Sequence, residues 1–155
     1  MLIEVQVAIA GSKEAVWAKI TDIVNASKTI SGIQKVEILE KPPIGIVGLK
    51  WRETRKLFGK TATEVMWITD AVENEFYKTR AESHGFIYEC KFRIAEQDGK
   101  SVLTMTHDGK PQAVMAKVLS KLLGFMLKGA MKKAILKDLN DIKSAVEQQN
   151  GSGTQ

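Results

Sequence analysis

The sequence predicts an α+β protein in which a curved antiparallel sheet of about seven strands wraps around one long C-terminal helix. Three observations lead to this prediction. The chain begins with a strand-like alternation, continues as a run of strand-like segments joined by short turns, and ends in apolar residues at helical spacing. Its 155 residues, 44% hydrophobic and 26% charged, suit one domain with a substantial core.

The first strand is expected at residues 2–10, where apolar residues alternate with Glu4 and Gln6 as in a half-buried strand. Gly11 and Ser12 then offer a turn and a helix N-cap, and apolar residues recur at helical spacing in the segment that follows. One or two short helices are therefore expected after this strand.

Six further strands are expected between residues 33 and 108. Turn-forming residues separate them, for example the pairs Gly59-Lys60 and Asp98-Gly99. The expected strands are residues 33–40, 47–58, 61–71, 75–83, 86–96 and 101–108. Because the links are short, successive strands are expected to pair as an antiparallel meander.

A long helix is expected over residues 112–148, followed by a flexible tail over residues 149–155, so that residues 1–148 form the single domain. The apolar stripe of its first half is rotated by roughly half a turn from that of its second half. Gly124 and Gly129 lie at the changeover, where a hinge is expected because glycine weakens a helix interior. The first half is then either a cover over a cavity mouth or a segment sandwiched in a dimer interface.

Two segments carry a resemblance to a known family. They are residues 10–17 (AGSKEAVW), with Thr21 and Asp22 behind them, and residues 47–55 (VGLKWRETR). Both are similar to the polyketide cyclase and dehydrase branch of the START-like, or SRPBCC, helix-grip superfamily, which also includes relatives of the birch-pollen allergen. The resemblance extends over nearly all of residues 1–148, and it implies a sheet that grips the last helix and leaves a cavity for a hydrophobic molecule.

Two departures limit what the resemblance implies. Residues 23–30 lack the Tyr-, Pro- and Trp-rich segment of many relatives. Residues 42–48 hold only two glycines, where the pollen-allergen branch has a glycine-rich loop. The resemblance therefore implies the fold, but no particular ligand.

Composition excludes several classes of protein. The 23 Lys+Arg against 18 Asp+Glu give a net charge of +5, without the dense basic clusters of a nucleic-acid binder. Cys90 is the single cysteine and there are two histidines, so no internal disulfide and no Cys- or His-rich metal site is expected. Neither a signal peptide nor a bilayer-spanning run is recognisable. We expect a cytoplasmic monomer or weak homodimer with no cofactor, no metal, no nucleic-acid partner and no stable membrane insertion.

The expected strand at residues 47–58 places an unusual pair of charges in the cavity. One set of alternate residues is polar throughout, so the other set, which includes Trp51, Glu53 and Arg55, should face the concave side. Glu53 and Arg55 are roughly 7 Å apart along the strand, close enough for their side chains to meet. The pair is either a polar anchor inside an apolar pocket or a wet pair beyond its edge.

The same alternation predicts the remaining cavity residues. The later strands should contribute Tyr77, Thr79, Tyr88, Cys90, Phe92, Met105 and His107, and the first half of the last helix Met115, Leu119, Leu122 and Met126. Each has a structural alternative. The tyrosines can be core aromatics whose hydroxyls reach a backbone group, Cys90 a small buried hydrophobe, and His107 an exposed or hydrogen-bonded histidine.

Three functions remain open. The chain could bind a hydrophobic small molecule, such as a lipid, polyketide or isoprenoid-like compound. It could be a cyclase or dehydratase, in which Glu53 or His107 moves protons, Tyr88 assists and Arg55 polarises a carbonyl group. It could instead be a protein-binding or membrane-surface adaptor that uses a lysine face of the last helix. This face consists of Lys117, Lys121, Lys128, Lys132 and Lys133. Such a face is also typical of a helix side that is simply exposed to water. The sequence shows no recognisable acid-base constellation, which favours binding.

Overall fold

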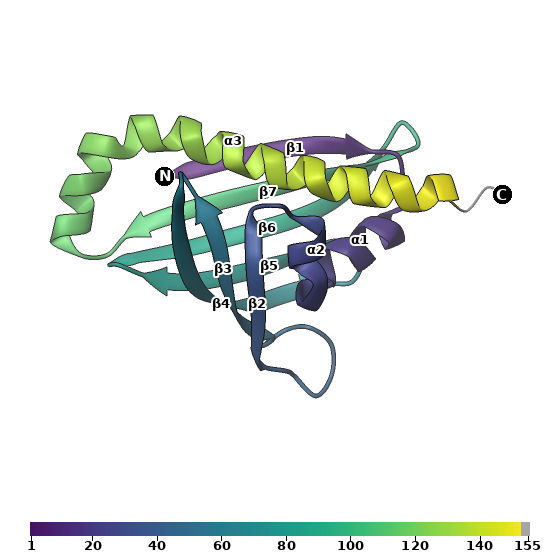
Figure 1. Cartoon of the computed structure of the whole chain (residues 1–155), viewed down its shortest axis with the longest axis horizontal. Coiled ribbons are helices and arrows are strands. Elements are labelled where there is room, and N and C mark those ends of the chain that lie inside the picture. The colour runs from purple at the N-terminus through teal and green to yellow at the C-terminus, as the bar shows by residue number, and fades with distance from the viewer. Residues whose placement is uncertain (153–155) are drawn as a thin grey trace.

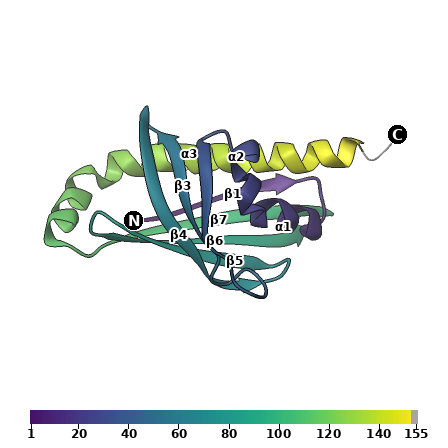
Figure 2. The same ribbon diagram turned by 60° about the horizontal axis from the view of Figure 1, so that its bottom comes forward.

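A seven-stranded antiparallel sheet curves around one long helix, as Figures 1 and 2 show from two directions. The computed structural model describes residues 1–152. Its elements are β1 (Leu2–Ile9), α1 (Lys13–Thr21), the 3-10 turn η1 (Ile23–Asn25), α2 (Ala26–Thr29), β2 (Ile33–Glu40), β3 (Lys50–Leu57), β4 (Lys60–Val72), β5 (Phe76–Ser83), β6 (Phe86–Gln97), β7 (Lys100–Pro111) and α3 (Val114–Ser152). The predicted α+β helix-grip architecture is confirmed.

The strand order is β1-β7-β6-β5-β4-β3-β2, so the first strand pairs with the last and the rest form a meander. Three connections are two-residue hairpin turns in which both residues have positive φ: Phe58-Gly59, His84-Gly85 and Asp98-Gly99. Such turns match the right-handed twist of the strands that they join. They also fix the register of each hairpin, and with it the side chains that face the helix.

Strand β3 begins at Lys50, three residues later than the expected strand at residues 47–58. Gly48 has a φ of +93°, and the N–H of Leu49 donates to the carbonyl of Ile46 in a turn. The prediction was wrong at this end because the apolar residues before Lys50 belong to a folded loop. The alternation from Trp51 onward is as predicted.

The core lies between the sheet and the second half of α3. Ile135, Leu139, Ile142 and Val146 follow one another at helical spacing and are buried. They form one core cluster with residues of the sheet, and α3 contacts β1 and β7, which includes the fully buried Leu103. This contact fixes α3 across the concave side of the sheet.

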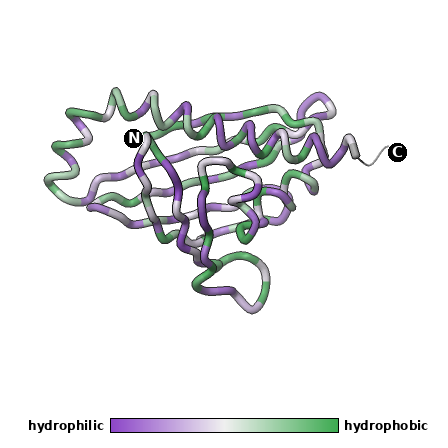
Figure 3. Tube along the Cα trace, viewed as in Figure 1, coloured by the Kyte–Doolittle hydropathy of each residue, from purple (hydrophilic) through white to green (hydrophobic). Residues whose placement is uncertain are grey.

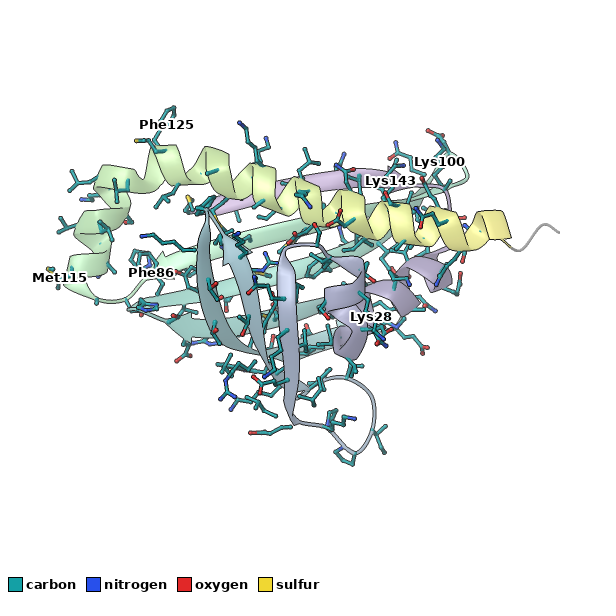
Figure 4. The ribbon with its side chains drawn as sticks, viewed as in Figure 1. Lys28, Phe86, Lys100, Met115, Phe125 and Lys143 are labelled. Atoms are coloured by element: carbon teal, nitrogen blue, oxygen red, sulfur yellow. The ribbon has the colours of Figure 1, made fainter. Side chains whose placement is uncertain are left out.

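Helix α3 is continuous from Val114 to Ser152, so it is not broken at Gly124 or Gly129, and a hinge at these glycines stays a prediction. The helix bends instead, and Figure 4 shows its direction changing between the labelled Met115 and Phe125. The expected tail at residues 149–155 is also wrong for its first part, because the helix continues through Ser152. Residues 153–155 lie outside the described residues.

Candidate functional site

A cavity of about 200 Å³ lies between the concave side of the sheet, the short helices and α3. Nine residues predicted for the cavity line it: Trp51, Glu53, Arg55, Tyr77, Thr79, Cys90, Phe92, Met105 and His107. Leu57, which the same alternation places on the concave side, also lines it. Apolar residues that were not predicted for the cavity complete the wall, among them Ile20, Ile23, Ile33, Met66, Met131 and Ile135. The concave face of the sheet is therefore predictable from strand alternation.

Five predicted residues do not line the cavity. The Tyr88 ring stacks between Phe86 and His107 on β6 and β7. The other four lie on the first part of α3, where the side chains are exposed: Met115, Leu119, Leu122 and Met126. Their predicted place in the cavity is wrong because the bend in α3 carries this segment away from the sheet (Figure 4).

Arg55 is the centre of a charged cluster on one side of the cavity. Its Nη2 donates to Asp138 Oδ2 of α3 at 2.9 Å, and its Nε lies 3.1 Å from Glu53 Oε1. The Nε–H is not aligned for a hydrogen bond and has no acceptor among the described residues. Trp51 Nε1 donates to the other oxygen of Glu53 at 3.4 Å. Arg55 thus lines the cavity and does not lie beyond its edge, while its role as an anchor for a ligand stays a prediction.

Glu64, like Asp138, is a cavity carboxyl that the sequence did not predict. It lies directly opposite Glu53 in the β3 and β4 pairing. Its carboxyl group forms no hydrogen bond among the described residues, so it is available to a ligand. We call Glu53, Arg55, Glu64 and Asp138 the Arg55 cluster.

The cluster contains three carboxyl groups around one guanidinium. Burial raises the pKa of Glu53 and of Asp138, and the charge of Arg55 opposes this rise in both. Burial and the neighbouring Glu53 charge raise the pKa of Glu64. Burial lowers the pKa of Arg55, but Asp138 and Glu53 outweigh it, so Arg55 stays charged. The cluster can therefore hold a proton at a carboxyl group near neutral pH more readily than exposed acids can.

Tyr77 serves the fold. Its hydroxyl donates to the carbonyl of Ile20 at 3.1 Å, its side chain is 3% exposed, and burial raises the pKa of the phenol. Its ring stacks on Phe92 with centroids 5.0 Å apart. Tyr77 is thus a core aromatic with a satisfied hydroxyl, as the structural alternative predicts.

Cys90 and His107 lie opposite each other on β6 and β7, with Cys90 Sγ 3.1 Å from His107 Nδ1. Burial raises the pKa of the Cys90 thiol to about 12 and lowers the pKa of His107. Both groups are therefore neutral near pH 7, and the cysteine is not an activated nucleophile. The second ring nitrogen of His107 makes no hydrogen bond among the described residues, so it can bind a polar group in the cavity.

Within residues 1–152, neither a metal-binding group of side chains nor a membrane-crossing helix is found. No group of three or more His, Cys, Asp and Glu side chains in this range is arranged to hold a metal ion. No helix in the same range combines the length and hydropathy that a membrane crossing requires.

Solved structures resemble this chain along nearly its whole length. TTHA0849 from Thermus thermophilus has a TM-score of 0.79 at 13% identity, covering 94% of this chain and 97% of that one. The Zhui aromatase/cyclase from Streptomyces sp. R1128 has a TM-score of 0.78 at 19% identity, covering 96% and 94%. A START superfamily protein from Mycobacterium smegmatis has a TM-score of 0.66 at 19% identity, covering 91% and 98%. At these identities the likeness shows the fold alone.

No curated protein matches the sequence. Residues 2–147 match the family described as polyketide cyclase / dehydrase and lipid transport. This match spans almost the whole sheet and the packed part of α3, and it agrees with the branch that the sequence resembles. The chain therefore belongs to the polyketide cyclase / dehydrase and lipid transport family.

Proposed function

We propose that the chain binds a compact hydrophobic molecule with a polar head group in the cavity between the sheet and α3. The observation that carries the proposal is an apolar cavity with the Arg55 cluster on one side. An apolar cavity of about 150 Å³ is large enough to hold benzene. A cavity of about 200 Å³ therefore suits a small aromatic or alicyclic ring system in this conformation.

Apolar burial alone gives weak binding at this size. A ligand about as large as an aromatic side chain buries roughly 150–250 Å². At about 25 cal/mol per Å², this burial contributes roughly 4–6 kcal/mol before the cost of association. The remaining binding free energy has to come from hydrogen bonds between the polar head group and the protein.

The Arg55 cluster selects the chemistry of that head group. Arg55 already contacts Glu53 and Asp138, and Glu64 lies opposite Glu53. Among residues 1–152, Lys19 is the only other Lys or Arg side chain on the cavity wall. A carboxylate ligand would add a negative charge to this group. A hydroxyl can donate to Glu64, and a carbonyl can accept a proton that a cluster carboxyl carries. We therefore propose a phenol, alcohol or hydroxyketone, of the kind found among polyketides and isoprenoids, and not a fatty acid.

Calorimetric titration with two probes of matched apolar size tests this proposal. We expect 2-naphthol to bind at least about tenfold more tightly than 2-naphthoate near pH 7. Ala134→Phe, which fills the cavity wall, should abolish binding, and Ala18→Phe on the exposed side of α1 should not. Failure of both probes to bind, or a preference for the acid, would contradict the proposal.

Acid-base catalysis on the bound molecule is a second candidate. It is favoured by the raised pKa of the facing carboxyls Glu53 and Glu64. One carboxyl would donate a proton to a leaving hydroxyl while the other accepts one from carbon, which amounts to loss of water. With a ligand identified, mass spectrometry should detect loss of one water, and Glu64→Gln should stop it without abolishing binding. His107→Ala separates a role for the imidazole from a role for the carboxyls.

The remaining expectations stay predictions. They are a cytoplasmic location, a monomer or weak homodimer, and the absence of cofactors and nucleic-acid partners. Size-exclusion chromatography with light scattering measures the oligomeric state directly.

A further inference from the structure

The first part of α3 presents large apolar side chains to solvent. Seven are at least half exposed, and they are Val114, Met115, Val118, Leu119, Leu122, Phe125 and Met126. Phe125 is 95% exposed and Met115 is 83% exposed. Figure 4 shows both pointing away from the body of the protein. Exposed apolar groups gathered on one element are typical of a docking surface.

These seven residues share one side of the helix. At 3.6 residues per turn they fall within a sector about 140° wide. Ala116, the buried residue of this segment, lies on the opposite side, against the His84-Gly85 turn. Figure 3 shows hydrophobic and hydrophilic residues alternating along the same arch of the chain. Leu123 and Leu127, each 41% exposed, extend the apolar side toward Ala116. The segment is therefore an amphipathic helix whose most exposed apolar side chains face outward.

The charge of this region indicates what the surface binds. Between Asp108 and Asp138 the sequence contains seven lysines and no acidic residue. Lys117, Lys121 and Lys128 flank the apolar sector, where their long side chains can reach a polar surface while the stems contact apolar groups. Pairing two copies of this surface would bring lysines of like charge together. An anionic partner is complementary to it.

The body of the protein holds the segment at both ends. At its start, the N–H groups of Gln112 and Ala113 donate to the Gly85 carbonyl at 2.7 and 3.3 Å. At its end, Met131 packs against the core and Ile135 belongs to it. The apolar side is therefore presented from a fixed position.

We propose that residues 114–128 dock this protein on the surface of an anionic lipid bilayer. The apolar sector enters the boundary between headgroups and acyl chains, and the lysines contact the anionic headgroups. This is peripheral binding, which agrees with the absence of a membrane-crossing helix within residues 1–152. The proposal does not depend on the cavity ligand, although such docking would bring a cavity for hydrophobic molecules to a membrane.

Vesicle co-sedimentation tests the proposal with the full chain. We compare vesicles of phosphatidylcholine alone with vesicles of phosphatidylcholine and phosphatidylglycerol in equal parts. Binding should be at least about tenfold stronger to the anionic vesicles, and weaker at about 1 M salt than at about 0.1 M, where screening is less. The cavity-filled Ala134→Phe variant should bind vesicles as the wild type does, which separates this test from that of the proposed function.

Two matched pairs of variants locate the binding surface. Phe125→Ser with Met126→Ser should weaken binding about tenfold or more, whereas Ile44→Ser, at a distant side chain that is 89% exposed, should not. Neutralising the three flanking lysines with glutamine should have a similar effect. Replacing three exposed lysines elsewhere with glutamine, Lys28, Lys41 and Lys60, should have little effect on vesicle binding. All of these positions are at the surface, so the variants are expected to fold.

Three results would overturn the proposal. Equal binding to neutral and anionic vesicles would remove the role of charge. Equal loss in the control variants would remove the role of this helix. A dimer in sedimentation velocity that the Phe125 and Met126 changes dissociate, together with no vesicle binding, would make the surface an interface between copies of this chain.

Discussion

Replacing Arg55 with methionine removes the counter-charge of two buried carboxylates. The Glu53, Asp138 and Arg55 side chains are 12%, 16% and 24% exposed. Removing one partner from a buried charged group costs about 3–5 kcal/mol, because the remaining charges are left uncompensated. Since these side chains remain partly exposed, we expect Arg55→Met to lower the free energy of unfolding by about 3 kcal/mol near pH 7. For a domain of this size, this corresponds to a fall in melting temperature of roughly 6–12 °C.

The loss should depend on pH. Arg55 lowers the pKa of Glu53 and Asp138 against the effect of burial, so in Arg55→Met both values rise further above the ordinary 4.5 and 3.8. Between the ordinary and the raised values, the folded variant binds protons that the unfolded chain does not. Its stability relative to the wild type therefore recovers as the pH falls through this window, and is lowest above it.

Urea unfolding followed by circular dichroism measures this loss at about pH 7 and about pH 5. Arg52→Met is the matched control, because Arg52 is the neighbouring residue on the outer side of β3 and pairs with Glu37 at 3.8 Å while 43% exposed. We expect it to cost less than about 0.5 kcal/mol at either pH. A loss under about 1 kcal/mol for Arg55→Met, or one unchanged with pH, would refute the reasoning about the cluster.

Three further predictions follow from other parts of the structure. Leu139→Ala should lower the free energy of unfolding by about 3 kcal/mol, because Leu139 is fully buried. Leu136→Ala, at a partly exposed position, should lower it by less than about 1 kcal/mol. Equal losses in the two variants would place the core elsewhere. Cys90 should react with iodoacetamide at about pH 8 only as the chain unfolds, because its folded-state pKa is about 12; rapid labelling of the native protein would contradict this. Gly124→Ala with Gly129→Ala should raise the free energy of unfolding by up to about 1 kcal/mol per site, since nothing lies within 4 Å of either added Cβ. If α3 must flex for the ligand to leave, the same variant should release 2-naphthol more slowly in stopped-flow measurements. Unchanged release rates would count against a hinge.

Strand alternation made most of the sheet side of the cavity predictable. One side of a strand faces the core throughout its length, so the outward Arg52 assigns its neighbours Trp51 and Glu53 to the cavity. The same reasoning was ambiguous for β4, where both sets of alternate residues contain large apolar side chains, Met66 and Ile68 in one and Val65 and Trp67 in the other. The Phe58-Gly59 turn could have resolved it, because a two-residue turn pairs Leu57 with Lys60 and hence Glu53 with Glu64.

The sequence could not give the contacts that join distant parts of the chain. Asp138 lies 83 residues from Arg55, and helical spacing does not show which strand residue it meets. A break, kink or tightened turn in α3 was expected at Gly124 or Gly129, but the course of the first part of the helix was not. The rotated apolar stripe was visible, but the sequence did not show that the segment stands away from the sheet with Met115 and Phe125 exposed. Side chains expected in the cavity therefore lie on the surface.

Native mass spectrometry of the protein purified from its own host without detergent tests the central claim most directly. We predict a discrete bound mass that organic extraction releases as a neutral hydrophobic compound. It should be absent from Ala134→Phe and retained by Ala18→Phe. If neither the wild type nor the variants carry a bound compound, or if the bound mass persists in Ala134→Phe, the account is contradicted.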